Sequence, residues 1–191
     1  MKLIIYAILM MLVTACASKP PAILQPVEKQ RHQQHLADLQ DWQFQGRLAY
    51  IEGKQKQSAS VQWQQQQKDF SLSLTTFIGI QILALSQDEE QAILEIDDQT
   101  HHADNATALL YELTQWHIPV NQMSRWLKGQ KTAGDIVNYS PSGWITSLTH
   151  GQWQVNYQQY KQVNQVALPH EIVVKGQGLT IKLRINKWTL H

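Results

Sequence analysis

The chain has 191 residues and a formal net charge of +1, from 16 basic and 15 acidic side chains. This near-neutral balance argues against nucleic acid as the main partner, because phosphate contacts require an excess of Lys and Arg. The single cysteine excludes a framework of disulfides within the chain.

The first 15 residues predict a lipoprotein signal peptide. Lys2 precedes an apolar run over residues 3–13, which is too short for a stable membrane-spanning anchor. Small residues then lead into Cys16, a pattern that resembles the bacterial lipobox, whose cysteine is acylated and becomes the first residue of the mature protein. We therefore expect N-acyl and S-diacylglycerol chains on Cys16, which together make a stable anchor, and no other cofactor. An ordinary secretory signal with an accidental cysteine is the alternative.

Residues 16–30 are predicted to be the lipidated cysteine and a flexible tether, because they are rich in Pro and polar residues and show no periodicity. In bacterial lipoproteins an Asp after the cysteine usually means retention in the inner membrane. Here that residue is Ala17, which favours the periplasmic face of the outer membrane. Residues 31–191 are then long enough for one domain with a sizeable core.

The first half of this domain alternates between apolar and polar residues with a period of two, which predicts strands. Phe44, Leu48 and Tyr50 fall on one side of the first alternating segment. The predicted strands cover 43–50, 58–64, 70–75, 81–86 and 91–97, and the predicted turns between them cover 52–54, 64–67 and 88–90.

The period changes to that of a helix over residues 104–116. Asp104 is the predicted N-cap of this helix. A second short helix is predicted over 121–129, capped by Asn121 and ended by Gly129. The apolar side chains at helical spacing in the first helix are Leu109, Leu110, Leu113 and Trp116.

Strands return at 143–150, 152–160, 170–176 and 179–188. The last of these alternates most regularly, with Leu179, Ile181 and Leu183 facing one way. Hairpin-length links, and no alternation of strands with helices, predict a mainly β fold with some α. We expect a curved antiparallel sheet or open barrel, with the two short helices covering its mouth or interior.

Residue types that carry catalysis or bind metals do not converge in this sequence. His101 and His102 are adjacent, so on a strand they face opposite ways, and His32 and His35 have no Cys or carboxylate at a suitable spacing. We therefore expect exposed histidines and no metal site. No nucleophile elbow and no phosphate-binding loop is present, so the chain is not predicted to be an enzyme. A hydrolase assembled from distant strands remains an alternative, without a visible nucleophile–base pair.

Seven tryptophans stand against only three phenylalanines. A barrel of this size can either fill its interior with such side chains or enclose a cavity for an acyl chain, and the sequence leaves both possibilities open. From the alternation, the predicted cavity lining is Phe44, Leu48, Trp63, Leu72, Leu74, Trp116, Trp126, Trp153, Ile181 and Leu183.

Five segments follow one another in the chain: the lipobox at Cys16, WQFQGRLAYIEGKQKQSASVQWQQ (42–65), LSLTTFIGIQILAL (72–85), WHIPVNQMSRWLKG (116–129) and IKLRINKW (181–188). In this order and spacing they resemble the LolB family of outer-membrane lipoprotein receptors. The resemblance implies an incomplete antiparallel β-barrel, a half-barrel sheet, with short helices as a lid over a hydrophobic cavity, and a function that is not enzymatic. It implies a monomer that takes acylated lipoproteins from a periplasmic, LolA-like carrier and inserts them among outer-membrane lipids. A lipocalin-like lipoprotein that binds a small lipid, and a scaffolding lipoprotein with a filled barrel, are the alternatives. Arg47, inside the first segment, receives no role.

The stretch Thr76-Phe77-Ile78-Gly79 matches a family loop in which a hydrophobic residue precedes a glycine. The resemblance aligns Ile78 with that residue, while Phe77 stands where proline is common. Two large side chains in a row cannot both face the core of a regular strand, and Gly79 suits a turn. We expect an exposed loop of Phe77, Ile78 and Gly79 that inserts into the membrane.

Overall fold

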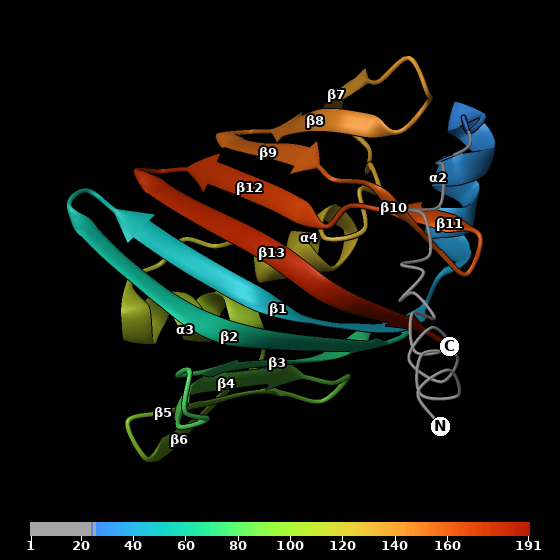
Figure 1. Ribbon diagram of the computed structural model, residues 1–191. Helices are drawn as coiled ribbons and strands as arrows, with labels where there is room; N and C mark the ends of the chain where they lie inside the picture. The colour runs from blue at the N-terminus through green and yellow to red at the C-terminus, as the bar shows by residue number, and fades with distance from the viewer. Residues whose placement is uncertain (1–23, 25) are drawn as a thin grey trace, which may run out of the picture.

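The structure is a computed structural model that describes residue 24 and residues 26–191 (Figure 1). The predicted signal peptide, Cys16 and most of the predicted tether lie outside the described residues. No helix within the described part of the chain is long and apolar enough to cross a membrane.

One antiparallel sheet of eleven strands makes up most of the fold, in the order β6-β5-β4-β3-β2-β1-β13-β12-β9-β8-β7. In the described part of the chain its edges, β6 and β7, do not pair with each other, so the barrel stays open (Figure 1). The predicted fold class is therefore confirmed. The strands are β1 (Asp41–Glu52), β2 (Gln55–Gln66), β3 (Asp69–Thr75), β4 (Gln81–Gln87), β5 (Ala92–Ile96), β6 (Gln99–Ala103), β7 (Ile136–Tyr139), β8 (Ile145–His150), β9 (Trp153–Gln158), β12 (Glu171–Gly176) and β13 (Leu179–Leu190).

Gly46 allows a close approach of the long paired strands β1 and β13. Their register shifts between Gln45 and Gly46. A Cβ atom at Gly46 would lie 2.3 Å from the carbonyl oxygen of Arg184, so only glycine allows this close approach of the two backbones.

The glutamines at the end of β2 do not form the predicted turn over 64–67. The strand continues to Gln66, and the turn follows at Gln67, which has a positive φ of 54°. Gln65 is buried: its Oε1 accepts a hydrogen bond from Trp63 Nε1 at 3.2 Å, and its Nε2 donates to the Gln67 carbonyl. Because both ends of the amide are satisfied, glutamine can stand at this interior position.

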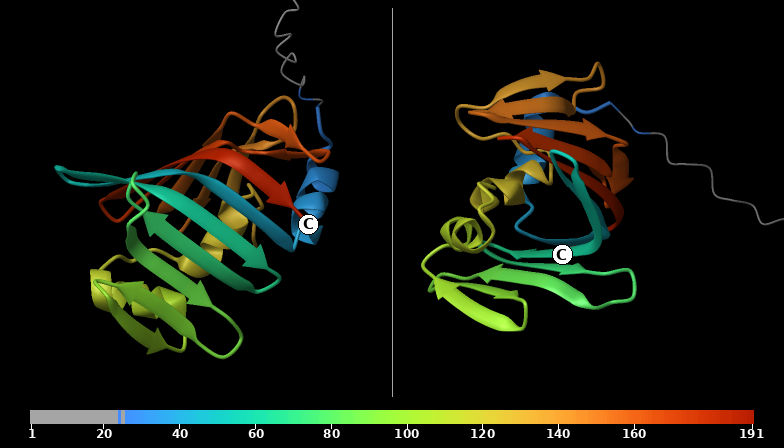
Figure 2. Two further views of the ribbon diagram at one scale, coloured as in Figure 1. Left: turned by 60° about the horizontal axis from the view of Figure 1, so that its bottom comes forward. Right: turned by 90° about the vertical axis from the view of Figure 1, so that its left-hand side faces the viewer.

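Helices α3 (Ala106–Thr114) and α4 (Val120–Trp126) lie on the concave side of the sheet, as predicted (Figures 1 and 2). The predicted caps are wrong. Asn105, not Asp104, caps α3, because its Oδ1 accepts from the Ala108 N–H at 2.8 Å. For α4 the N-cap position is Pro119 rather than Asn121, and no side chain caps this helix.

A third helix, α2 (Lys29–Asp38), begins inside the segment predicted to be a tether. Glu28 accepts from the Gln30 and Arg31 N–H groups, and the Val27 N–H donates to the Ser142 carbonyl at 2.8 Å. The folded domain therefore starts before residue 31, since these bonds fix the chain entering α2.

Two buried polar side chains hold α2 against the rest of the domain. His32 Nε2 lies 2.9 Å from the carbonyl oxygen of Ala167 in the small hairpin of β10 (Lys161–Val163) and β11 (Val166–Leu168). The expectation of exposed histidines is therefore wrong for His32. Lys128 Nζ donates to the Leu36 and Leu39 carbonyls, both at 2.7 Å, and so satisfies acceptors at the C-terminal end of the helix.

Candidate functional site

An apolar cavity of about 110 Å³ lies between the concave face of the sheet and the two helices. Strands β1 to β4 and β13 supply one wall, and α3, α4 and the chain between them supply the other. Eight of the ten side chains expected in the lining are there: Phe44, Leu48, Trp63, Leu72, Leu74, Trp116, Ile181 and Leu183.

The other two predicted lining residues, Trp126 and Trp153, lie elsewhere, and this part of the prediction is wrong. Both are buried, with ring centroids 6.5 Å apart, and Trp126 also packs edge-on against His150 at 5.9 Å. They form a separate part of the core, beneath β8 and β9. Alternation correctly assigns Trp153 to the interior of the sheet, but it does not tell which part of a long interior is hollow.

Thirteen of the 21 lining residues were not predicted from the sequence. On β1 and β2, the missed Tyr50, Ala59 and Val61 share the alternating face of predicted lining residues, so the same pattern could have identified them. On the helix side, the lining residues come from α3, from the chain around Pro119 and from α4. No single helical period runs through these three segments, so the sequence pattern could not identify this part of the lining. The missed residues include Tyr50, Ala59, Val61, Ile82, Leu83 and Leu85 from the strands, and Leu110, Ile118, Val120, Met123 and Leu127 from the helical side.

A ring stack joins the sheet wall to the helical wall. The rings of Tyr50 and Trp116 have centroids 4.4 Å apart, and the Tyr50 hydroxyl donates a hydrogen bond to the Glu52 carboxylate. Burial, with the Glu52 charge adding to it, raises the pKa of Tyr50 to about 12, so the hydroxyl is a neutral donor at physiological pH. Trp116 lies beyond the last residue of α3, in the chain between the helices, where it can move without unwinding either.

The cavity reaches the surface beside β4. Ile82 belongs to the lining and is also 40% exposed. It is the second residue of β4, separated by Gln81 alone from the connection between β3 and β4, which carries Phe77 at 89% exposed, Ile78 at 65% and Ile80 at 60%. An exposed apolar surface is therefore continuous along the chain with the wall of the cavity.

The connection that carries Phe77 and Ile78 is a closed turn. The Thr76 N–H donates to the Ile80 carbonyl at 2.8 Å, and the Ile80 N–H donates to Thr76 Oγ1 at 3.0 Å. Gly79 has a φ of +88°, which favours glycine although nothing surrounds a Cβ built there. Phe77 and Ile78 are exposed as expected, and do not continue a buried strand. Their insertion into a membrane stays a prediction.

A second cavity, of about 360 Å³, has a different chemistry. Its walls include five glutamines, Asn121 and Ser124, together with Lys68, Arg125 and Lys128. Burial lowers the pKa of Lys128 to about 8, which still leaves it mostly protonated at neutral pH, so the three basic side chains make the cleft cationic. A lining of amides and cations suits water better than an acyl chain, so the smaller, apolar cavity is the candidate site.

No group of three His, Cys, Asp or Glu side chains that could hold a metal occurs among residues 24 and 26–191.

Comparison with known proteins gives related chains of nearly the same length. A chain from Aeromonas hydrophila described as "Outer-membrane lipoprotein LolB" is 37% identical over 182 residues, which cover 95% of this chain and 93% of that one. A Vibrio cholerae protein of the same description is 33% identical over 192 residues, with 95% and 92% covered.

Among solved structures, a LolA superfamily protein from Nitrosomonas europaea matches with a TM-score of 0.56 at 7% identity, over 86% of this chain and 94% of that one. A DUF1329 family protein from Desulfovibrio piger matches with a TM-score of 0.55 at 5% identity, over 87% and 94%. At such low identity these matches establish the fold alone. The family model described as "Outer membrane lipoprotein LolB" matches residues 40–188. The chain therefore belongs to the LolB family of outer-membrane lipoproteins.

Proposed function

We propose that the protein receives lipoproteins from a periplasmic carrier, holds their acyl chains in the apolar cavity and passes them into the outer membrane. The observation that carries this proposal is the position of Ile82, which lies in the cavity wall and is separated from the exposed apolar turn by Gln81 alone. An acyl chain leaving the cavity at this point emerges beside Phe77 and Ile78, and so keeps apolar contact on its way to lipid.

The cavity must enlarge to hold an acyl chain. At about 110 Å³ it is smaller than the cavity of ~150 Å³ that holds one benzene molecule in a protein core. The sheet wall is fixed by its hydrogen bonds, so the helical wall is the part that moves. Separation of the Tyr50 and Trp116 rings is the first step of that opening, because this stack joins the two walls.

Transfer from carrier to receptor to membrane needs a gain in affinity at each step, since no nucleotide drives it in the periplasm. A tenfold gain requires about 1.4 kcal/mol. One better-buried aliphatic group supplies that amount, so a modest difference in lining is enough to set the direction.

The exposed turn is the proposed membrane wedge. In solution Ile78 forgoes roughly 1.5–3 kcal/mol of burial, which it recovers on entering lipid. Phe77 stands beside it and adds a second apolar side chain. Cys16, with its N-acyl and S-diacylglycerol chains, is the proposed anchor that keeps the turn near the bilayer. The protein acts as a monomer and as a transfer protein rather than a catalyst.

The wedge is tested with the substitution Ile78→Glu. We expect this variant to accept a labelled lipoprotein from the carrier but to fail to deliver it to liposomes. Ile136→Glu is the matched control, because Ile136 is 71% exposed but lies in edge strand β7, away from the turn. Normal delivery by Ile78→Glu, or equal failure of both variants, would contradict the proposed role.

A lipocalin-like binder of a small lipid is not favoured. Such a protein needs the apolar cavity but has no use for exposed Phe77 and Ile78 next to its opening. A scaffolding lipoprotein with a filled barrel is not favoured either, because an apolar cavity lies between the sheet and the helices.

A further inference from the structure

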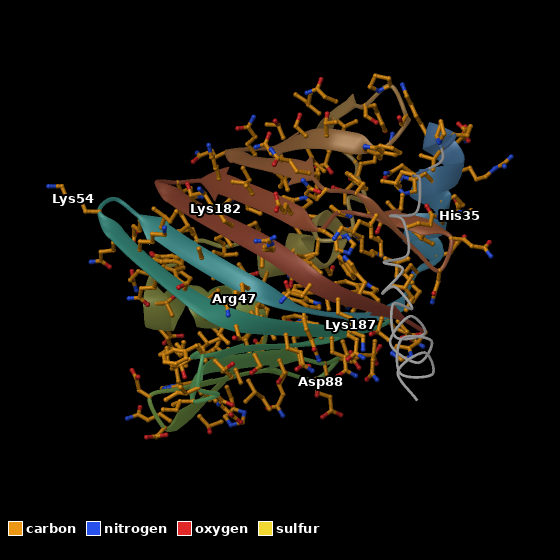
Figure 3. All side chains as sticks on the ribbon, in the orientation of Figure 1. His35, Arg47, Lys54, Asp88, Lys182 and Lys187 are labelled. Carbon is orange, nitrogen blue, oxygen red and sulfur yellow. The ribbon has the colours of Figure 1, made fainter. Side chains whose placement is uncertain are left out.

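The outer, convex face of the sheet carries a concentration of positive charge. Arg47, Lys182 and Lys187 project from this face in Figure 3, and all are exposed. We call the full set the cationic stripe: Arg47 of β1, Lys56 of β2, Lys175 of β12, and Lys182, Arg184 and Lys187 of β13. These six side chains stand on four neighbouring strands of a protein whose total charge is only +1.

The strand register aligns these side chains in four successive cross-strand rows. The rows are Lys56–Ile51–Thr180–Lys175, Ser58–Ala49–Lys182–Val173, Ser60–Arg47–Arg184–Glu171 and Gln62–Gln45–Lys187. Every row holds at least one cation. Because rows on one face are two residues apart, the stripe extends for roughly 20 Å along the strands.

The stripe is poorly neutralised. Among the described residues, Glu171 is the one acidic side chain in these rows, and its Oε1 lies 4.0 Å from Arg184 Nε, a long and exposed contact. Arg47 stands directly opposite Arg184, a pairing of like charges that destabilises a sheet. The folded state gains nothing from this arrangement, which is a reason to look for an external anion.

The positions that continue these rows on either side of the stripe are uncharged. Toward β3, two of the rows continue into Thr75 and Ser73, and toward β9 three rows continue into Gln154, Asn156 and Gln158. Hydroxyl and amide side chains would keep the whole outer face soluble without any cations. The positive charge is therefore confined to the centre of the face, where a partner could meet all of it.

We propose that the cationic stripe docks on the phosphate groups of anionic lipids and so holds the outer face of the sheet against a membrane surface. A membrane is the partner because both views of Figure 2 place the β3–β4 connection and the chain entering α2 on the same side of the molecule as this face. One surface can thus meet the apolar turn, the anchored end of the chain and the stripe together. The inference rests on the location at the outer membrane and does not require the transfer of cargo.

Each Lys or Arg close to an anionic membrane surface strengthens binding about fivefold. The effect requires the charge to lie within a Debye length, about 8 Å, of the headgroups. The curved sheet brings its central strands, β1 and β13, closest to a flat surface, and these strands carry four of the six cations.

The test measures sedimentation with vesicles in the absence of carrier and cargo. A form that starts at Ala17 is suitable, because all contacts described above lie within residues 24 and 26–191. We expect it to bind phosphatidylethanolamine vesicles that contain phosphatidylglycerol, with an affinity that falls at high salt, and to bind phosphatidylcholine vesicles weakly. The double variant Arg47→Gln/Arg184→Gln should bind the anionic vesicles about 25-fold more weakly. Its fold should persist, since it removes a repulsion.

The matched control is Arg125→Gln/Lys131→Gln, which removes the same charge on and after α4, behind the sheet. We expect it to bind the anionic vesicles almost as the unaltered protein does. Equal weakening of both double variants, or unchanged binding by Arg47→Gln/Arg184→Gln, would overturn the proposal. A separate pull-down with cargo-free carrier checks for a protein partner: loss of carrier binding by Arg47→Gln/Arg184→Gln, with vesicle binding intact, would also overturn the proposal, because the stripe would then be a protein-docking surface. Each of these outcomes leaves the transfer function to be judged separately, since no cargo is present.

Discussion

Filling the apolar cavity should stabilise the protein and abolish its function. Ala59 of β2 lines the cavity opposite Leu48, so Ala59→Leu places three more carbon atoms in the empty space. Three buried carbons contribute up to about 2.4 kcal/mol. We therefore expect the free energy of unfolding to rise by about 1–2 kcal/mol after some strain.

The same side chain occupies the space that an acyl chain needs. Binding of a fluorescent fatty-acid probe and uptake of a labelled lipoprotein should both fall at least tenfold in Ala59→Leu. Urea unfolding followed by tryptophan fluorescence gives the stability change, and titration with the probe gives the affinity change.

Ala84→Leu is the control, because Ala84 alternates with buried Leu83 and Leu85 and so faces outward from β4. It adds the same atoms without entering the cavity and should change neither quantity much. The reasoning would be refuted if Ala59→Leu were more stable and still took up probe normally, since the acyl chain would then bind somewhere else.

Three further predictions concern the fold. Gly46→Ala should lower the free energy of unfolding by more than about 3 kcal/mol in urea titrations, because its Cβ would collide with the Arg184 carbonyl; an unchanged midpoint would show that the strands can part there. Burial lowers the pKa of Lys128 to about 8, so between pH 8 and 10 the unfolded chain binds more protons and stability should rise with pH by as much as about 2 kcal/mol. Lys128→Met should remove this rise, and a rise that persists would assign it to another group. Burial also lowers the pKa of His32 below its usual 6.5, so stability should fall as the pH drops below that value, and His32→Gln should flatten this loss in unfolding curves measured across that range.

The sheet could be predicted from the sequence because its strands keep a strict period of two. Leu179, Ile181 and Leu183 face inward in β13 as their alternation indicates, and they are all buried. The exposed turn was also predictable, since Phe77 and Ile78 interrupt that period in front of a glycine. In both cases the information is local to a few neighbouring residues.

Features that depend on contacts between distant segments were not predictable. Helix α2 has a polar composition. Its His32 contacts the Ala167 carbonyl of β11, and Lys128, just after α4, donates to its Leu36 carbonyl; no local sequence pattern predicts these contacts. Trp126 and Trp153 have the same spacing signals as the true lining, yet they pack against each other in another part of the core. Sequence patterns identify which side chains are inside, whereas packing decides which part of the inside stays empty.

The cationic stripe illustrates the same limit on the outer face. The sequence assigned no role to Arg47, because its cross-strand neighbour Arg184 is far away in the chain. Only the pairing of β1 with β13 brings the two charges together. The register of β1 with β13, which shifts at Gly46, places Arg47 opposite Arg184.

The central claim is tested most directly by asking which protein holds a lipoprotein after the carrier has met this one. The form starting at Ala17 is mixed with carrier loaded with a labelled lipoprotein, and the two proteins are separated by their affinity tags. We predict that the label moves to this protein, and that it stays on the carrier when Ala59→Leu is used. Retention of the label by the carrier, while free fatty-acid probes still bind in the cavity, would contradict the receptor function and make a small-lipid binder the better account.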